Sequence, residues 1–177
     1  MSYIVSKLVS KNKVSMQTID SLVNDLKLLP HPEGGFYREM YRSPTIVNAD
    51  GLVQKSAYTS IYYLLSGSDF SSWHRIKSDE TWYFHSGGDV IIYFFDQNKA
   101  LQTIQVGIDA KCLQATIPAN TWFAAKPISQ NSFCLISCAV APGFEFADFE
   151  IGKRQTLLSQ FGHSMGNIQA IEALTRA

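Results

Sequence analysis

One short stretch of the chain combines a histidine, a carboxylate and several aromatic residues at spacings that suit chemistry. It runs Trp73-His74-Arg75-Ile76-Lys77-Ser78-Asp79-Glu80-Thr81-Trp82-Tyr83-Phe84-His85-Ser86-Gly87. Alternate residues of a strand point to one face, so Glu80 should share its face with Trp82 and Phe84. If the turn at residues 77–79 closes a hairpin, His74 and Glu80 point into the same interior.

A histidine beside a carboxylate in an aromatic cavity suits two kinds of chemistry. The two side chains can be ligands of a first-row metal ion, or an acid/base pair whose pKa values are separated by burial. A hydrogen-bonded pair that only fills a core is the third interpretation. Because catalytic metal sites normally supply three or more protein ligands, two ligands rarely hold a divalent ion tightly. We expect no cofactor and no metal; if a metal binds, His74 and Glu80 are its ligands.

The expected cavity has aromatic walls and few polar anchors, which is typical of a small-molecule pocket. The candidate wall residues are Phe36, Tyr63, Trp82, Phe84 and Phe123, and the candidate anchors are Arg38, His74, Glu80 and Asp148. An inward Arg38 would form paired hydrogen bonds with a carboxylate or a phosphate. The alternatives are a surface position for Arg38 and an ordinary core role for the aromatic residues.

The elements that must position these residues are short strands with helices at the two ends of the chain. Apolar residues at helical spacing between residues 15 and 29 predict a helix that Pro30 and Pro32 end. Strands are predicted over residues 58–65, 73–76, 81–85, 89–95, 101–106, 113–117, 121–125 and 133–140. A final strand over 146–150 and helices over 153–161 and 167–176 complete the pattern. Strands about ten residues apart indicate a sandwich or a barrel.

The length of 177 residues and the 46% hydrophobic content are enough for one domain that folds without disulfides or metal. We expect an N-terminal extension over residues 1–14, a single domain over 15–162, and a C-terminal helix or tail over 163–177. The predicted strand over 89–95 is apolar on both faces. A small barrel cannot cover both faces alone, so we predict a homodimer.

The charge balance excludes several classes of partner. Lys plus Arg and Asp plus Glu each number 15, which disfavours binding to nucleic acid or to an acidic membrane surface. No apolar stretch is long enough to span a bilayer, and no secretory signal is present. The three cysteines are expected to be small buried residues without a disulfide. We therefore predict a cytoplasmic protein whose partners are a small-molecule ligand and a second copy of itself.

The stretch around His74 resembles the first cupin motif, because His74, Glu80 and Gly87 fall at matching spacing, and Pro118-Ala119-Asn120-Thr121-Trp122-Phe123 echoes the second motif. More specifically, three phrases resemble the Cupin-5 family: Leu29-Pro30-His31-Pro32-Glu33-Gly34-Gly35-Phe36-Tyr37-Arg38-Glu39, the stretch around Trp73-His74, and Ala141-Pro142-Gly143-Phe144-Glu145-Phe146-Ala147-Asp148-Phe149-Glu150. The resemblance implies an all-β fold, the cupin-type double-stranded β-helix or jelly-roll barrel, with short N- and C-terminal helices.

The departures from the cupin pattern favour a metal-independent protein. Metal-binding cupins usually offer three His and one Glu, but Ile76 and Phe123 stand at two of the His positions. The resemblance extends in fold to the metal-free dTDP-sugar epimerases, in which a His oriented by an Asp removes a proton next to a ketone while a Tyr acts as acid. That comparison makes His74 the base.

In the same comparison Asp148 or Glu80 would orient His74, and Tyr63 or Tyr83 would be the acid. Three functions stay open. The first is a metal-independent cupin that binds a small polar metabolite such as a sugar nucleotide, and isomerises or epimerises it with His74. The second is a metal-dependent oxygenase or isomerase. The third is a binding module without catalysis.

Overall fold

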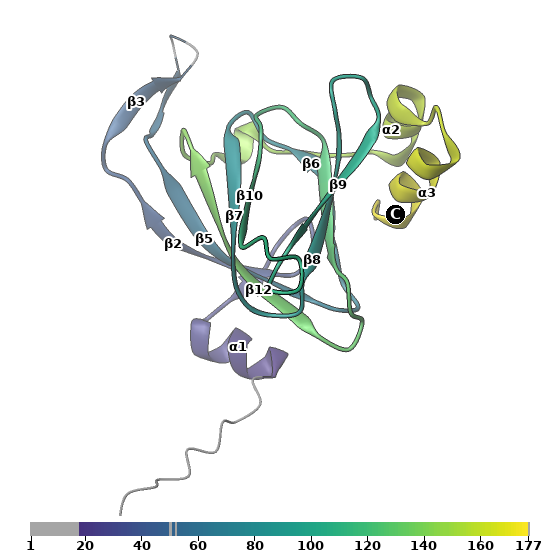
Figure 1. Cartoon of the computed structure of the whole chain (residues 1–177). Helices are drawn as coiled ribbons and strands as arrows, with labels where there is room; N and C mark the ends of the chain where they lie inside the picture. Colours follow the sequence, from purple (N-terminus) through teal and green to yellow (C-terminus); the bar gives the residue numbers. More distant parts are fainter. Residues whose placement is uncertain (1–17, 50, 52, 177) are drawn as a thin grey trace, which may run out of the picture.

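The structure is a computed structural model that describes residues 18–49, 51 and 53–176. The expected extension over residues 1–14 lies outside the described residues. The described chain folds into two antiparallel sheets that face each other, a small hairpin and helices at both ends (Figure 1). This is the architecture of a jelly roll and confirms the all-β expectation.

The larger sheet has six strands in the order β1-β2-β5-β12-β7-β10. Their bounds are β1 Leu29–Pro30, β2 Phe36–Arg42, β5 Thr59–Ser66, β12 Phe133–Ala141, β7 Asp79–Gly87 and β10 Gln114–Ile117. The second sheet has five strands in the order β13-β6-β11-β8-β9. Their bounds are β13 Glu150–Ile151, β6 Ser71–Arg75, β11 Phe123–Pro127, β8 Val90–Phe95 and β9 Leu101–Val106. The remaining two strands, β3 Ile46–Ala49 and β4 Val53–Ser56, form a hairpin of their own.

The core fills the space between the two sheets. It contains alternate side chains of the facing strands, among them Leu65, Trp82, Ile92, Phe123 and Ile136, each at most 1% exposed. Alternation along each strand puts these residues on the inner face and leaves the other face for helices or solvent. The fold therefore points two sets of side chains into one interior, which is where the candidate site lies.

The N-terminal helix α1 (Ile19–Leu26) covers the outer face of the six-stranded sheet. Thr18 caps this helix, because its side chain accepts a hydrogen bond from the backbone N–H of Ser21. The Ser21 hydroxyl in turn accepts a hydrogen bond from the backbone N–H of Thr18. Leu22 and Leu28 pack there against Leu64. The predicted helix is thus confirmed and ends before Pro30.

The C-terminal helices α2 (Arg154–Phe161) and α3 (Met165–Ala173) cover the outer face of the five-stranded sheet (Figure 1). Ile171 and Leu157 pack there with Phe95, Tyr93 and the stacked ring of Trp73. The outward face of β8, from which we predicted a homodimer, is therefore covered by helices of the same chain. The homodimer stays a prediction that this strand no longer supports.

Two local expectations differ from the structure. The strand predicted over 146–150 is a single 3-10 turn, η1 (Phe146–Asp148), followed by the short strand β13. The residues between β6 and β7 do not close a hairpin, because these strands belong to different sheets. The chain crosses between the sheets there, so His74 and Glu80 approach the interior from opposite walls. None of the described helices is long and apolar enough to cross a membrane.

Candidate functional site

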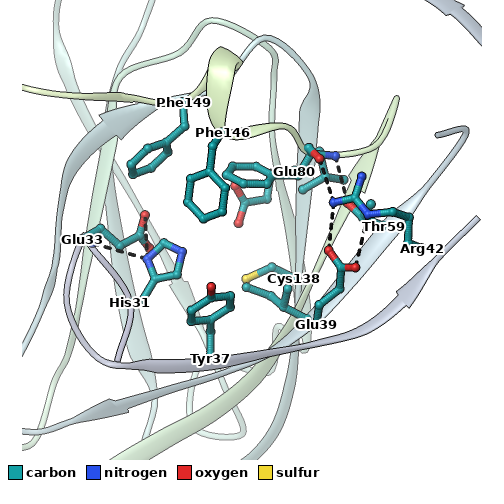
Figure 2. Close-up of a pocket in the computed structure, with 13 residues that line it drawn as sticks. His31, Glu33, Tyr37, Glu39, Arg42, Thr59, Glu80, Cys138, Phe146 and Phe149 are labelled. Atoms are coloured by element: carbon teal, nitrogen blue, oxygen red, sulfur yellow. Dashed lines mark hydrogen bonds and ion pairs between the residues drawn. The ribbon is translucent and has the colours of Figure 1, made fainter. Parts of the chain in front are cut away.

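A cavity of ≈ 130 Å³ opens between the sheets near η1. Its lining residues are His31, Glu33, Tyr37, Glu39, Arg42, Thr59, Ile61, Glu80, Cys138, Val140, Phe144, Phe146 and Phe149. Figure 2 shows the phenyl rings of Phe146 and Phe149 on one side of the space and Tyr37 and His31 on the other. The cavity is therefore small, has aromatic rings on two sides, and carries carboxyl groups in its walls.

The loop between β1 and β2 supplies two side chains of this cavity, His31 and Glu33, which are not among the site residues predicted from the sequence. The loop folds back on itself, since the His31 N–H donates to Gly35 O at 3.0 Å and the Gly34 N–H donates to His31 O at 3.0 Å. Glu33 is only 5% exposed. A short polar loop is thus folded into the end of the barrel.

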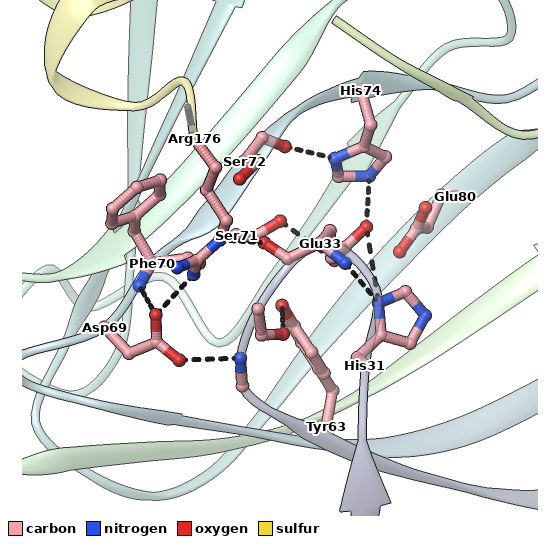
Figure 3. A network of polar contacts seen from close by, with 12 residues as sticks. His31, Glu33, Tyr63, Asp69, Phe70, Ser71, Ser72, His74, Glu80 and Arg176 are labelled. Carbon is pink, nitrogen blue, oxygen red and sulfur yellow. Dashed lines mark hydrogen bonds and ion pairs between the residues drawn. The ribbon is translucent and has the colours of Figure 1, made fainter.

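Contacts with two distant parts of the chain hold this loop in place (Figure 3). The Glu33 carbonyl accepts hydrogen bonds from Ser72 N–H at 2.9 Å and from Arg176 Nε at 3.2 Å. Arg176 also pairs with Asp69, whose Oδ2 accepts the Gly35 N–H at 2.8 Å. The C-terminal segment and β6 together fix the backbone that carries Glu33.

Glycine at position 34 is required by both conformation and space. Gly34 has φ +116°, a value that L residues rarely adopt, and a Cβ there would overlap the carbonyl of Phe70 and the guanidinium of Arg176. The Gly34 carbonyl also accepts the hydroxyl hydrogen bond of Tyr63 at 2.8 Å. The backbone can approach β6 this closely only because no side chain intervenes.

A β-bulge in β6 turns two polar side chains toward Glu33. Opposite β11, His74 pairs with Phe123 and Ser71 pairs with Ala125, so β6 carries one extra residue across this interval. In a regular strand, residues three apart would point to opposite faces. The bulge brings both inward: Ser71 Oγ donates to Glu33 Oε1 at 2.9 Å, and His74 Nε2 lies 3.2 Å from Glu33 Oε2.

The hydrogen bond at the other nitrogen of His74 fixes its tautomer. Nδ1 lies 2.7 Å from the carbonyl oxygen of Ser72, which can only accept, so Nδ1 carries a hydrogen. The contact between His74 Nε2 and Glu33 Oε2 is then favourable only if a proton lies between them. His74 is 2% exposed. The two side chains therefore hold one shared proton in a site closed to solvent.

Burial sets the direction of both pKa values in this pair. Desolvation lowers the pKa of His74, against the opposing effects of Glu80 and the Ser72 carbonyl. Desolvation also raises the pKa of Glu33, against the effects of His31 and a hydrogen bond from Ser71. Both directions favour the neutral form, in which the Glu33 carboxyl donates its proton to Nε2 of His74.

Glu80 approaches the same cavity from β7, the opposite sheet. It is 8% exposed, and its Oε1 accepts a hydrogen bond from Trp82 Nε1 at 2.9 Å. Burial raises the pKa of Glu80 to about 7, with Glu33 raising it further and His74 and the Cys138 thiol opposing the rise. Glu80 is therefore a carboxyl group that exchanges its proton near neutral pH.

His31 presents a hydrogen-bond donor to the cavity. Its Nδ1 accepts the backbone N–H of Glu33 at 3.4 Å, so the neutral ring carries its hydrogen on Nε2. Burial lowers the pKa of His31, which favours that neutral ring. The ring packs edge-on against Tyr37, with centroids 4.6 Å apart. Figure 2 shows the second ring nitrogen facing the cavity.

The roof of the cavity is formed by Phe144, Phe146 and Phe149, on both sides of η1. Asp148 in this segment pairs with Lys55 of β4 at 2.5 Å and with Lys77 at 3.3 Å. These ion pairs hold the roof against the hairpin and the turn between the sheets.

At the rim of the cavity, Arg42 is fully engaged by neighbouring acceptors. It forms two hydrogen bonds with the carboxylate of Glu39, at 3.2 and 2.9 Å, and one with Glu145 at 2.8 Å. Its guanidinium also donates to the carbonyl of Phe144 at 3.1 Å. Among the described lining residues, the one arginine is thus paired with two glutamates, and the three side chains together carry a net negative charge.

The structure gathers some of the predicted site residues and separates others. His74 and Glu80 influence each other's pKa, and Glu80 lines the cavity while His74 lies behind Glu33. Tyr63, Trp82 and Phe123 lie beneath the site, in the core between the sheets, with the Phe123 ring 4.0 Å from that of His74. Phe84 packs against the same core and does not line the cavity.

Three other candidates lie away from the cavity. Phe36 packs on the outer face of its sheet with the α1 cluster, and Arg38 is exposed and donates to Leu26 O at 3.1 Å. Their neighbours Tyr37 and Glu39 line the cavity instead. The face of β2 that carries Phe36 and Arg38, which was expected to point inward, therefore points outward. Asp148 is occupied by its lysine partners and does not orient His74, a position that Glu33 takes.

The candidate acids also differ from the expectation. Tyr83 is 39% exposed on β7, away from the interior, and Tyr63 donates its hydroxyl to Gly34 O. A signal for the missed residues was present in the sequence: His31 and Glu33 precede two consecutive glycines. Such a pair marks backbone that approaches another part of the chain closely. Only the fold shows which part.

The donor set of a metal-binding cupin is not assembled around His74. Within the described residues, no group of three or more His, Cys, Asp or Glu side chains is arranged to hold a metal ion. Phe123 packs on the His74 ring where a further ligand would approach, and Ile76 is buried. The proton shared with Glu33 occupies the nitrogen of His74 that a metal would need. The residues present do not fit such a centre.

Comparison with known proteins places the chain among the cupins. The sequence model of Cupin_5, described as cupin superfamily (DUF985), matches residues 20–152. An uncharacterized protein from Saccharomyces cerevisiae is 27% identical over 173 residues, covering 88% of this chain and 84% of that protein.

Two solved structures are similar over 91% of this chain. A protein from Shewanella oneidensis is 34% identical with a TM-score of 0.81, covering 99% of that chain. A hypothetical protein from Leishmania major is 28% identical with a TM-score of 0.82, covering 100% of that chain. The chain therefore belongs to the Cupin_5 family of the cupin superfamily.

Proposed function

We propose that this protein binds a small polar metabolite in the cavity and isomerises it by acid–base proton transfer. The observation that carries the proposal is the placement of two proton-exchanging groups in one enclosed site. One is Glu80, with a pKa of about 7, and the other is the Glu33–His74 pair with its shared proton. Two titratable groups in different environments are the usual arrangement for paired acid and base roles.

The proton transfers balance for a compound with a carbonyl next to a carbon that bears hydrogen and a hydroxyl. The Glu80 carboxylate removes the proton from that carbon, and the C–H electron pair becomes the double bond of an enediol. The carbonyl oxygen takes the proton held by Glu33 and His74. Return of the Glu80 proton to the neighbouring carbon, and of the hydroxyl proton to Glu33, completes the isomerisation.

The remaining polar groups of the cavity support substrate orientation. His31 Nε2–H is a donor that faces the cavity, and the hydroxyl of Tyr37 points into it (Figure 2). Either donor can hold the oxygen on which negative charge develops. In this proposal Tyr37, and not Tyr63 or Tyr83, is the tyrosine that contacts the substrate.

The size of the cavity favours a compact ligand. Its ≈ 130 Å³ is well below the roughly 300–1,000 Å³ of sites for drug-sized molecules. A sugar nucleotide, which the sequence comparison suggested, would have to leave its nucleotide outside the rim. Arg42 is engaged by Glu39 and Glu145 and offers little to a phosphate. We therefore favour a small hydroxycarbonyl compound over a sugar nucleotide.

Hydrogen exchange tests the function directly. The full-length protein is incubated in D2O with separate small hydroxyaldehydes and hydroxyketones, and deuterium at carbon is followed by NMR. We expect incorporation with the wild type and a loss of about 100-fold or more in Glu80→Gln and Glu33→Gln. Glu150→Gln, which changes an exposed carboxyl paired with Arg75, is the matched control. Binding without exchange would make this a binding module instead.

We propose the cytoplasm as the compartment of this protein, as the sequence predicted. Cys112, Cys134 and Cys138 are free thiols, and Cys134 and Cys138 are buried. Free thiols persist in a reducing compartment, which supports the proposal.

A further inference from the structure

The described residues that line the cavity include no positively charged side chain without an acidic partner. Among the described lining residues Arg42 is the one Lys or Arg, and it is paired with two carboxylates, Glu39 and Glu145, so that this group carries a net negative charge. Lys55 and Lys77 lie outside the lining and are paired with Asp148. The Glu33–His74 pair holds its one proton and is neutral. Glu80 therefore adds a further negative charge without a cationic partner whenever it ionises.

The roof and walls add aromatic faces and edges around that charge. The centroids of Phe144 and Phe146 are 5.1 Å apart and those of Phe144 and Phe149 are 6.0 Å apart, with each pair of rings strongly inclined. Tyr37 and His31 close the opposite side (Figure 2). Inclined rings around one space are the arrangement in which proteins hold ammonium groups by cation–π attraction.

We infer that the ligand of this cavity is a small organic cation, an ammonium compound whose charge lies beneath Phe144, Phe146 and Phe149 and is balanced by the carboxylate of Glu80. The inference rests on the proposed function and adds the chemical class of its substrate. An anionic ligand would face Glu80 and Glu33 with no cation to pair with, and its desolvation would be uncompensated. A cation exchanges its hydration for aromatic faces and a carboxylate.

A cationic substrate also supplies what the proposed chemistry lacks. Enediol formation concentrates negative charge in the cavity, and no free Lys or Arg among the described lining residues is available to stabilise it. An ammonium group on the substrate near the reacting carbon stabilises that charge and makes the C–H more acidic. The same positive charge favours the ionised, basic form of Glu80.

Proton linkage follows from this arrangement. The groups that face Glu80 are Glu33 from the loop, His74 from β6, Trp82 from β7 and Cys138 from β12. None of them provides a fixed positive charge, so the bound cation becomes the principal group that stabilises the carboxylate. Binding should release a proton below about pH 7 and weaken about tenfold for each pH unit further down.

A matched pair of ligands tests the charge requirement. Full-length protein is titrated calorimetrically with choline and with the isosteric alcohol in which a tert-butyl group replaces the trimethylammonium group. Ethanolamine and tetramethylammonium are titrated as smaller cations. We expect at least one cation to bind, and choline to bind at least about tenfold more tightly than its isostere. No binding of any of the three cations at millimolar concentration, or equal binding of choline and the isostere, overturns the inference.

Variants separate the cation site from a nonspecific apolar effect. Glu80→Gln should remove the preference for the cation, and Phe146→Leu should weaken cation binding about three- to tenfold more than isostere binding. Glu150→Gln and Phe161→Leu, away from the cavity, should leave both unchanged. Retention of the full preference in Glu80→Gln would also contradict the inference.

The deuterium experiment keeps this inference distinct from the proposed function. Cation binding without carbon-bound exchange in any ammonium-bearing hydroxycarbonyl compound leaves the ligand class standing and removes the isomerase. Exchange in neutral hydroxycarbonyl compounds, together with no preference for choline over its isostere, would support the isomerase and contradict the cationic ligand.

Discussion

His74 Nε2 lies 3.2 Å from Oε2 of Glu33, although His74 belongs to β6 and Glu33 to the loop between β1 and β2, in different parts of the sequence. Ser71, brought inward by the β6 bulge, holds the other oxygen of the same carboxyl. The loop and β6 thereby form one unit, in which an error in either element displaces the shared proton.

The buried Glu80 should make the stability of the protein depend on pH. Its pKa is about 7 in the folded state and 4.5 in the absence of the fold. The folded state therefore binds more protons between these values, and the contribution of this group to stability is lost as the pH rises through that window. Relative to Glu80→Gln, the wild type should lose about 3 kcal/mol of unfolding free energy between about pH 4.5 and pH 7.

Urea unfolding of the two proteins across this window measures the difference. Subtracting the unfolding free energy of Glu80→Gln from that of the wild type removes the pH-dependent contributions of Glu33, His31 and His74, which both proteins share. Parallel curves for wild type and Glu80→Gln would mean that Glu80 is not buried as described.

Removing His74 should destabilise the fold. His74→Ala removes the ring nitrogens that meet the Ser72 carbonyl and Oε2 of Glu33 in a closed site, and it removes the ring that packs on Phe123. We expect a loss of about 3 kcal/mol in unfolding free energy. The control is His85→Ala on the exposed part of β7, expected within about 0.5 kcal/mol of the wild type. Equal effects of the two changes would contradict the shared-proton arrangement.

The loop that carries Glu33 should not tolerate a side chain at position 34. Gly34→Ala forces a methyl group against Phe70 O and Arg176, in addition to strain at φ +116°. Gly51→Ala has a comparable backbone strain, with φ +78°, but meets no atom within 4 Å. We expect about 1 kcal/mol of destabilisation at Gly51 and at least about 3 kcal/mol at Gly34. Thermal unfolding of both variants shows whether the steric contact at position 34 or the backbone strain common to both positions causes the destabilisation.

A further ligand, in addition to His74 and Glu80, can be added beside His74. The Phe123 ring lies 4.0 Å from the His74 ring, so Phe123→His places a second imidazole near His74 and the carboxyls of the cavity. We expect the affinity for Zn²⁺ or Ni²⁺ to rise at least about tenfold over the wild type. Phe123→Leu controls for the loss of the ring, and unchanged metal affinity in Phe123→His would place the two side chains too far apart.

The homodimer now rests on a different surface from the one first considered. Large apolar side chains are exposed on β2 and along the following hairpin, including Met40, Tyr41, Ile46 and Tyr58. The edge of β2 beyond its short pairing with β1 is also unpaired among the described strands. Light scattering at micromolar concentration should give twice the mass of the chain. A monomer there, or a dimer unaffected by Tyr41→Lys with Ile46→Lys, would exclude this surface.

Strand periodicity was sufficient to place most of the secondary structure. The strand over residues 101–106 matches β9 residue for residue, and the other predicted strands through β12 overlap strands of the structure. Periodicity failed at residues 146–150, because aromatic residues between polar ones suit a 3-10 turn that packs on a cavity as well as they suit a strand. It also failed on β2, where both faces carry aromatic and charged residues, so that alternation alone does not say which face is buried.

The sequence by itself determined the family, the all-β class and the two side chains His74 and Glu80 as candidates, because motif spacing and strand periodicity are local properties. Only the tertiary structure decided how these residues are used. The bulge in β6, the crossing between the sheets and the loop locked by Arg176 are all set by contacts between distant segments. Those contacts brought Glu33 to His74 and closed both away from water. Since burial and a nearby partner set a pKa, the acid–base character of the site is a property of the fold.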